Sequence, residues 1–277
     1  MPCSTQLARV LPLEKATMED LLNTAIRAAH AGGRVLMQGF GTLGLGDMEV
    51  KGPTDIVTEW DRASEAEIVR VINEAFTDSR FLAEEKGEFG KGEKVWIIDP
   101  LDGTKNYYRG LPVFAVSVAL AIDGEIVLGV VHDPTRDETY TATKGGGAFA
   151  GMRRLRVSEK RELVGSFLAT GFPHRRKEDT DAYLATFKSF FRDALSIRRL
   201  GAAALDLAHV ACGIYDGFWE FQLYPWDVAA GYLLVKEAGG LMTDFGGQED
   251  FFRPSSVVAG NPFIHGQMLR AIKEIVR

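Results

Sequence analysis

Residues 96–104 read Trp-Ile-Ile-Asp-Pro-Leu-Asp-Gly-Thr, and no other stretch of the chain is as informative. The apolar run over 95–98 predicts a short buried strand that ends in an acid. Pro100 fixes its own φ and has no N–H, so we expect the strand ladder to stop there. The turn that follows can then aim the carboxylates of Asp99 and Asp102 into one small space.

Two carboxylates at this spacing have two interpretations. Like charges this close repel unless a cation lies between them, and Mg²⁺ prefers oxygen ligands of this kind. Gly103 lets the backbone approach a ligand closely, and Thr104 adds a hydroxyl beside the carboxylates. If a helix begins after this motif, the free N–H groups at its start can hold a phosphate. Asp is also common in turns, so an Asp-capped turn with Thr104 as a helix cap is the competing interpretation.

Three further acidic segments raise the same choice. In 81–87, apolar residues lead into Glu84 and Glu85, which are either site residues or the end of a strand in a solvated loop. Asp227 lies at the mouth of an Ala-rich helix, where an N-cap is a common role for Asp. Asp61 opens another helix and is either a cap or a catalytic acid. A metal ligand at a helix N-terminus can also cap, so the two roles are not exclusive.

The composition bounds the class of protein. The chain has 277 residues, 46% of them hydrophobic and 25% charged, which is enough for a large buried core. The net charge of -6 provides no basic field for nucleic acid. Cys3 and Cys212 are too few for a disulfide framework, which favours a reducing compartment. No apolar run suits a signal peptide or a membrane span, so we expect a cytoplasmic protein without membrane contact.

Hydrophobic periodicity and turn residues predict mixed helices and strands. Helices are expected over about 19–38, 61–76, 179–191, 202–211, 226–237 and 262–276. Strands are expected over 95–98, 113–122, 126–132, 139–143, 156–157, 196–200 and 217–221. A turn at Asp123-Gly124 should join the second and third of these strands. This mixture predicts an α/β or α+β layered architecture.

Taken in order, the four acidic segments resemble the signature of the inositol monophosphatase family in its bacterial form. Residues 55–61 match Asp-x-Val-Thr-x-x-Asp, and 83–85 match the Gly-Glu-Glu motif with alanine in place of glycine. Residues 96–106 match Trp-x-Ile-Asp-Pro-Leu-Asp-Gly-Thr-x-Asn. Residues 226–240 match Trp-Asp-x-Ala-Ala-Gly followed by Glu-Ala-Gly-Gly. The resemblance covers the chain from about Asp20 onward, and two long motifs make it specific.

The resemblance implies a fold as well as a site. The expected fold is a layered αβαβα sandwich of the inositol monophosphatase and fructose-1,6-bisphosphatase type, formed as a single domain over 1–277. Residues 1–16 would be an N-terminal extension of open role, and the family implies a homodimer. Two departures from the pattern are Ala83 for glycine and Tyr107 for phenylalanine, of which the first bears on the metal held by Glu84.

The resemblance also implies roles for individual residues. Two or three Mg²⁺ ions would be held by Glu84, Asp99, the carbonyl of Leu101, Asp102 and Asp227. Thr104 with Asp61 would orient and deprotonate the attacking water, and Glu84 would assist. Contacts to the substrate would come from Asp102, Gly103, Thr104, Arg198, Gly201, Ala202, Ala203, Glu220 and Asp227. The competing interpretation is that Arg198, together with Arg199, makes a surface or dimer contact.

The implied activity is Mg²⁺-dependent hydrolysis of a phosphate monoester by direct attack of a metal-activated water, without a phosphoenzyme. Inositol-1-phosphate is the expected substrate, because Glu220 matches a position that binds ring hydroxyls. Fructose-1,6-bisphosphate, histidinol phosphate and a nucleotide 3′-phosphate are alternatives for the same site. Inhibition by Li⁺ is expected. A regulatory binding protein of the transcription machinery is the alternative from another class, and a complete set of carboxylates argues against a purely non-catalytic role.

Several other motifs have simpler interpretations. Residues 39–44 spell Gly-x-Gly-x-x-Gly but follow a predicted helix rather than a strand, which excludes the dinucleotide-binding context. Residues 144–147, Lys-Gly-Gly-Gly, predict a turn. The basic run 174–177 predicts a solvated loop, with an acidic partner or RNA as the less favoured interpretation. The five histidines are expected to have no catalytic role.

Overall fold

The computed structural model describes residues 15–44, 48–52, 55–174 and 176–276. The helices are α1 (Met18–Gly39), α2 (Glu59–Ala75), α3 (Thr104–Tyr108), α4 (Thr180–Asp193), α5 (Ala203–Ala211), α6 (Pro225–Glu237), α7 (Pro262–Ile275) and a short 3-10 helix, η2 (Lys177–Asp179). The first strands are β1 (Glu49–Gly52), β2 (Asp55–Val57), β3 (Arg80–Ala83), β4 (Gly87–Gly90), β5 (Val95–Asp102), β6 (Ala115–Ile122), β7 (Glu125–Asp133) and β8 (Glu138–Thr143). The others are β9 (Gly147–Ala150), β10 (Arg153–Arg154), β11 (Phe167–Thr170), β12 (Ser196–Arg198), β13 (Gly217–Leu223), β14 (Leu241–Asp244) and β15 (Ser255–Gly260).

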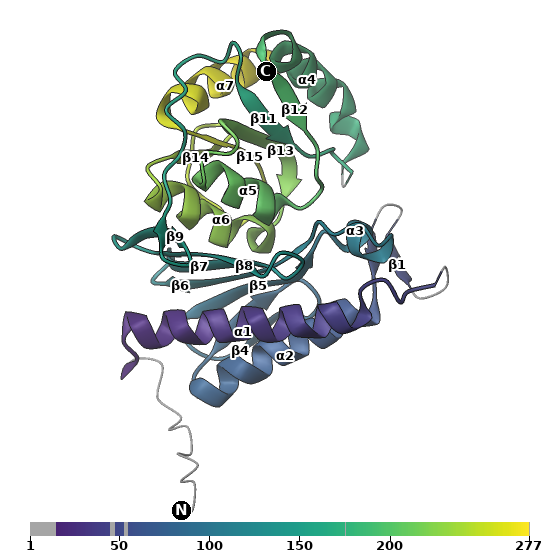
Figure 1. Ribbon diagram of the computed structural model, residues 1–277, viewed down its shortest axis with the longest axis vertical. Coiled ribbons are helices and arrows are strands. Elements are labelled where there is room, and N and C mark those ends of the chain that lie inside the picture. The colour runs from purple at the N-terminus through teal and green to yellow at the C-terminus, as the bar shows by residue number, and fades with distance from the viewer. Residues whose placement is uncertain (1–14, 45–47, 53–54, 175, 277) are drawn as a thin grey trace, which may run out of the picture.

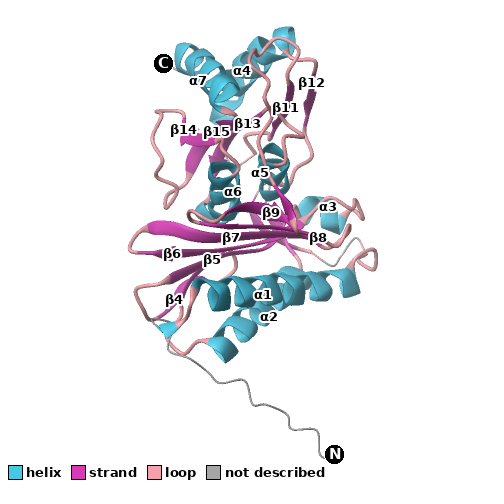
Figure 2. Cartoon of the chain, turned by 60° about the vertical axis from the view of Figure 1, so that its left-hand side comes forward, coloured by secondary structure: helices cyan, strands magenta, loops and turns pink. Residues whose placement is uncertain are grey.

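The elements stack in five layers (Figures 1 and 2). Helices α1 and α2 cover one face of the larger sheet, whose strands in the described residues run in the order β10-β9-β8-β7-β6-β5-β3-β4. Helices α5 and α6 lie between this sheet and the smaller one, ordered β12-β11-β13-β15-β14. Helices α4 and α7 cover the far side of the smaller sheet. This is the layered αβαβα sandwich that the resemblance predicts.

One apolar core joins the two sheets. A continuous cluster of buried side chains runs from Ile97 in β5 through α5 and α6 to Val257 in β15. Because α5 and α6 contact a sheet on each side, they are apolar almost all round rather than amphipathic, and small residues dominate them. Gly129 in β7 shows how close the layers come, since a Cβ there would lie 2.8 Å from the carbonyl oxygen of Ala230 in α6.

Most of the predicted elements are confirmed. The predicted turn at Asp123-Gly124 joins β6 to β7, and both residues have positive φ, 52° and 75°, as a type I′ hairpin requires. The predicted strand over 156–157 is wrong, because Val157 donates its N–H to the carbonyl of Ala238 at the end of α6 instead of to a sheet. Several short strands were not predicted, because their runs lack clear alternation; they are β1, β2, β4, β9, β11, β14 and β15.

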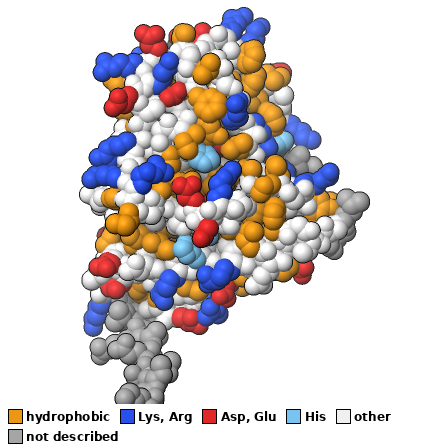
Figure 3. Space-filling model, viewed as in Figure 1, with side chains coloured by type: hydrophobic (Ala, Val, Ile, Leu, Met, Phe, Trp, Pro, Cys, Tyr) orange, Lys and Arg blue, Asp and Glu red, His pale blue; other side chains and the backbone are white. Residues whose placement is uncertain are grey.

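None of the helices in the described ranges has the length and apolarity that crossing a membrane requires. Figure 3 shows acidic, basic and apolar side chains intermixed over one face of the molecule, without a field of basic side chains on that face.

Candidate active site

The two aspartates of the central motif reach one side of the sheet because β5 carries a bulge. The strand continues to Asp102, so the expectation that it stops at Pro100 is wrong. Asp99 pairs with Ser117, and Asp102 pairs with Ala115. The chain therefore advances three residues along β5 where it advances only two along β6. In a regular strand, residues three apart point to opposite faces, and one extra residue brings them to the same face.

Backbone N–H groups fix both aspartates. Asp99 is 1% exposed, and its Oδ1 accepts a hydrogen bond from the N–H of Leu101 at 3.0 Å. Asp102 accepts at Oδ2 from the N–H of Ala204 at 2.7 Å, in the first turn of α5. The positive end of a helix favours a carboxylate in this place. Asp102 therefore joins the larger sheet to the middle helix layer at the site.

Asp227 comes to the same place from the start of α6. It occupies the third helical position, while Tyr224 is the N-cap residue, so the interpretation of Asp227 as an N-cap is wrong in position. Its Oδ2 accepts from the N–H of Tyr224 at 2.7 Å, which completes a capping box. Asp227 therefore both caps α6 and faces the site, and the sequence left room for both roles.

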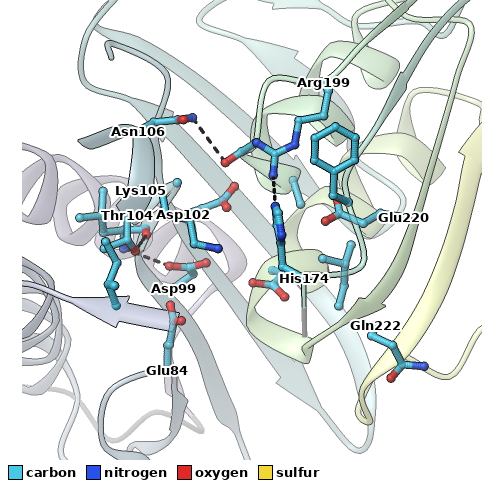
Figure 4. A pocket seen from close by; sticks show the side chains of 18 of the residues that line it. Glu84, Asp99, Asp102, Thr104, Lys105, Asn106, His174, Arg199, Glu220 and Gln222 are labelled. Carbon is cyan, nitrogen blue, oxygen red and sulfur yellow. Dashed lines mark hydrogen bonds between the residues drawn. The ribbon is translucent and has the colours of Figure 1, made fainter. Parts of the chain in front are cut away.

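These carboxylates open into one pocket between the two sheets (Figure 4). The carboxylates of Glu84 and Asp99 face each other beside Asp102, with Arg199 and Glu220 on the facing wall. The pocket is lined by Ile56, Glu84, Asp99, Leu101, Asp102, Gly103, Thr104, Lys105, Asn106, Phe172, His174, Arg199, Gly201, Ala203, Glu220, Phe221, Gln222, Leu223 and Asp227.

The electrostatics of the pocket favour a cation. Burial holds the pKa of Asp99 well above its usual range, and the charges of Glu84, Asp102 and Asp227 and a hydrogen bond with Glu84 raise it further. A divalent cation would remove this penalty, and carboxylate and carbonyl oxygens are the ligands that Mg²⁺ prefers, so the donor set fits the metal. Within the described residues, no three acidic, His or Cys side chains stand in an arrangement that could already hold a metal ion.

Beside the carboxylates lies a hydroxyl bonded to a buried acid. Gly103 is the N-cap of α3 with φ 95°, and a Cβ there would lie 2.9 Å from the carbonyl oxygen of Val113, so only glycine fits. The interpretation of Thr104 as the cap is therefore wrong. The Oγ1 of Thr104 lies 3.1 Å from Oδ1 of Asp61 and 3.1 Å from the carbonyl oxygen of Leu101.

Asp61 is 1% exposed in the first turn of α2. Burial raises its pKa to about 6, against hydrogen bonds from the N–H and hydroxyl of Thr58 at 2.8 and 2.6 Å. Both interpretations of Asp61 therefore have a basis, because it completes a capping box and also faces Thr104. An acid of this pKa can exchange a proton near neutral pH.

The facing wall comes from the smaller sheet and the start of α5. Gly201, Ala203 and Glu220 line the pocket, whereas Ala202 is fully buried behind it as the N-cap of α5. The carboxylate of Glu220 lies directly over Gly171, where an added Cβ would be 1.9 Å from Glu220 Cδ. The Glu220 side chain can occupy this position only because residue 171 is a glycine.

Arg198 does not line the pocket, and its neighbour Arg199 does. The guanidinium of Arg198 lies over the ring of Phe167 at 4.8 Å and donates to Ser196, outside the site. The guanidinium of Arg199 lies over the ring of Phe172 at 4.8 Å, and its Nη2 is 3.1 Å from Nε2 of His174. Consecutive residues of an extended segment point to opposite sides, which is why the two arginines separate.

His174 and Asn106 are pocket residues that sequence reasoning missed. The basic run 174–177 suggested a solvated loop, yet His174 faces the carboxylates across the pocket. Asn106 donates from Nδ2 to the carbonyls of Val113 and Leu200 at 2.8 and 2.9 Å, and so ties α3 to the segment before α5. The position of Asn106 inside the central motif was the available signal. The predicted turn at 144–147 is confirmed, since it joins β8 to β9 and the N–H of Gly146 donates to the carbonyl of Thr143 at 2.9 Å.

Comparison with known proteins extends the likeness over the chain. Residues 17–277 match the family model described as the inositol monophosphatase family. A Mesorhizobium japonicum protein named inositol-1-monophosphatase is 44% identical over 256 residues, covering 92% of this chain and 96% of that one. The Nus factor SuhB of Escherichia coli is 43% identical over 259 residues, covering 93% and 97%. The crystal structure of the extragenic suppressor protein suhB from Bartonella henselae gives a TM-score of 0.87 at 43% identity, covering 92% and 98%.

Proposed function

The chain belongs to the inositol monophosphatase family, and from this premise we propose that it is a Mg²⁺-dependent phosphatase of small phosphorylated molecules. The observation that carries the proposal is the meeting of four carboxylates, those of Glu84, Asp99, Asp102 and Asp227, in one pocket. The hydrogen-bonded pair of Thr104 and Asp61 beside them supplies a route for a proton.

The cation set would be two or three Mg²⁺ ions, held by Glu84, Asp99, the carbonyl of Leu101, Asp102 and Asp227. When bound, Mg²⁺ supplies charge neutralisation of the phosphate, a lowered pKa of the attacking water and stabilisation of the leaving oxygen. This help matters because phosphate monoester hydrolysis is among the slowest uncatalysed reactions.

The chain's own residues would position the reactants and move the proton. The Thr104 hydroxyl would accept a proton from the attacking water while donating its own to Asp61, whose pKa of about 6 suits this exchange. The water oxygen forms a bond to phosphorus as the phosphorus–oxygen ester bond breaks. The leaving alcohol oxygen would take a proton from solvent, Asp61 would return its proton to solvent, and inorganic phosphate would be released without a phosphoenzyme.

Substrate selection would depend on the facing wall. Backbone N–H groups of Gly103 and Thr104, with the segment 201–203, would hold the phosphate. The carboxylate of Glu220 would accept hydrogen bonds from ring hydroxyls, which favours a polyol such as inositol-1-phosphate. We propose Arg199, rather than Arg198, as the arginine that faces the substrate.

The first experiment is phosphate release from a panel of esters with Mg²⁺ and with EDTA. The panel comprises inositol-1-phosphate, fructose-1,6-bisphosphate, histidinol phosphate and a nucleotide 3′-phosphate. We expect release to require Mg²⁺ and to be fastest with inositol-1-phosphate. Equal release with EDTA would overturn the metal mechanism, whereas a different preferred ester would overturn only the substrate. Inhibition by Li⁺ at saturating Mg²⁺ is the matching prediction for the metal site.

A second candidate function follows from the relatives named Nus factor SuhB. At 43% and 45% identity over 93% and 92% of this chain, they favour a binding role in the transcription machinery in addition to the phosphatase. Copurification of this chain with RNA polymerase, compared between the native sequence and Asp99→Asn, tests that role. Equal recovery of both would separate binding from catalysis, and recovery of neither would argue against binding.

The homodimer and the cytoplasmic location stay predictions, and sedimentation velocity tests the dimer.

A further inference from the structure

Glu65 in α2 is a fully buried acid that the proposed mechanism does not use. Its side chain is 0% exposed, and glutamate is almost never buried so completely unless a partner holds it. Burial raises the pKa of its carboxyl, while the N–H groups of Glu85 and Lys86 oppose the shift. An apolar side chain of this size would fill the space without that cost. Oε1 has no hydrogen-bond partner within the described residues, so the contact made by Oε2 is the one that can explain the acid.

Those contacts are with the turn that carries Glu84. Residues 84–86 form the tight connection between β3 and β4. Oε2 of Glu65 accepts a hydrogen bond from the N–H of Glu85 at 2.9 Å. The N–H of Glu84 itself donates to the carbonyl of Ile98 at 3.2 Å, next to Asp99. The backbone of Glu84 is therefore fixed on one side by β5 and on the other by Glu65.

Glu65 belongs to a face of α2 that supports the whole carboxylate wall. Asp61, Ser64 and Glu65 have the spacing of residues that share one helix face, and all three are buried. Asp61 accepts from Thr104, and the Oγ of Ser64 donates to the carbonyl of Pro100 at 2.9 Å. One helix face thus bonds the 84–86 turn, β5 and the start of α3, which bring the acids and the hydroxyl to this side of the pocket.

We propose that Glu65 is a positioning residue of the site. By holding the 84–86 turn, its carboxylate fixes the carboxylate of Glu84 opposite Asp99 and so sets the affinity of the pocket for its divalent cation. The role rests on the proposed function, because the cation is taken to be Mg²⁺. Groups that orient metal ligands from behind typically change metal affinity about 10- to 100-fold when they are altered.

The test compares two conservative variants. Glu65→Asp shortens the side chain by one methylene and withdraws the oxygen from the N–H of Glu85, whereas Glu65→Gln keeps an oxygen that can accept it. In calorimetric titration with Mg²⁺ and no substrate, we expect Glu65→Asp to weaken binding about 10- to 100-fold and Glu65→Gln to stay within about threefold. At saturating Mg²⁺, the kcat of Glu65→Asp should return to within about threefold of the native value.

Ile68→Val, one helical turn further along, is the control for loss of packing alone. Ile68 is buried in α2 and contacts the apolar core, so this variant should lower thermal stability and leave Mg²⁺ affinity unchanged. Native affinity in Glu65→Asp, or an equal loss in Ile68→Val, would overturn the proposal. If the native chain binds Mg²⁺ but releases no phosphate, the proposed function fails, and the order of affinities still decides the role of Glu65.

Discussion

The two walls of the pocket are held in different ways. On the larger sheet, Asp99 and Asp102 are buried and each is bonded to a backbone N–H. On the facing wall, Phe172 and Arg199 are exposed, and Arg199 is held by a ring and by His174. Buried carboxylates that are bonded to backbone N–H groups keep one geometry. An exposed side chain that packs against an aromatic ring, as Arg199 does, can change its conformation. The difference suits a fixed wall for the reaction and an adaptable wall for the substrate.

Removing a charge from the fixed wall should have the largest effect. Asp99→Asn keeps the shape of the side chain but loses a cation ligand worth several kcal/mol, so we expect kcat/KM to fall about 1000-fold or more. Stability in EDTA should not fall, because the amide also removes the repulsion that raises the pKa of this acid. Phosphate release and urea unfolding measure the two effects, with the exposed Asp181→Asn as control. Native turnover in Asp99→Asn would contradict the role of the wall.

Changing the proton route should have the next largest effect. Asp61→Asn should lower kcat about 100-fold, and the rise of activity with pH near 6 should disappear. The folded state holds the proton of Asp61 more tightly than the unfolded state, so native stability falls as pH rises from 3.8 to about 6. Asp61→Asn should abolish that fall, which amounts to at most about 3 kcal/mol. An unchanged pH profile of the rate would remove Asp61 from the proton route.

On the adaptable wall, a change should alter substrate choice more than turnover. Gly171→Ala must displace the carboxylate of Glu220, because the new Cβ would lie 1.9 Å from Glu220 Cδ. Losing a hydrogen bond to a charged group should raise KM for inositol-1-phosphate about tenfold, with kcat changed less than about threefold. A simple aryl phosphate should be unaffected. Gly266→Ala, where the new Cβ meets open space, is the control. Equal effects on both esters would mean that Glu220 does not select the polyol.

The smallest effect should come from behind the adaptable wall. Asp206 in α5 is 1% exposed, and neither carboxylate oxygen has a hydrogen-bond partner within the described residues. Burial and then the charges of Glu220 and Asp102 raise its pKa well above the usual value, so native stability falls as pH rises above 3.8. Asp206→Asn should therefore be more stable than the native chain near pH 8, and the difference should be smaller near pH 4. Urea unfolding at the two pH values measures this difference, and a less stable variant near pH 8 would contradict it.

Local patterns predicted the elements that contain their own signals. The amphipathic helix over 19–38 and the Asp123-Gly124 hairpin are confirmed, because periodicity and turn conformation depend on neighbouring residues. The strand over 156–157 is wrong because Val157 finds its hydrogen-bond partner at Ala238, far along the chain. Short strands such as β15 become strands only through pairing with β13 and β14, which no local pattern reveals.

The sequence by itself determined which residue types the site contains, since the motifs around Asp99, Asp227 and Asp61 give the family and its donor oxygens. Only the tertiary structure decided where they point. The bulge in β5 brings Asp99 and Asp102 to one face, and the alternation of an extended segment turns Arg199 inward and Arg198 outward. The support of Glu84 by Glu65 likewise depends on the packing of α2 on the larger sheet. A motif fixes the chemical groups, but their directions follow from strand register and helix packing, which depend on residues far apart in the chain.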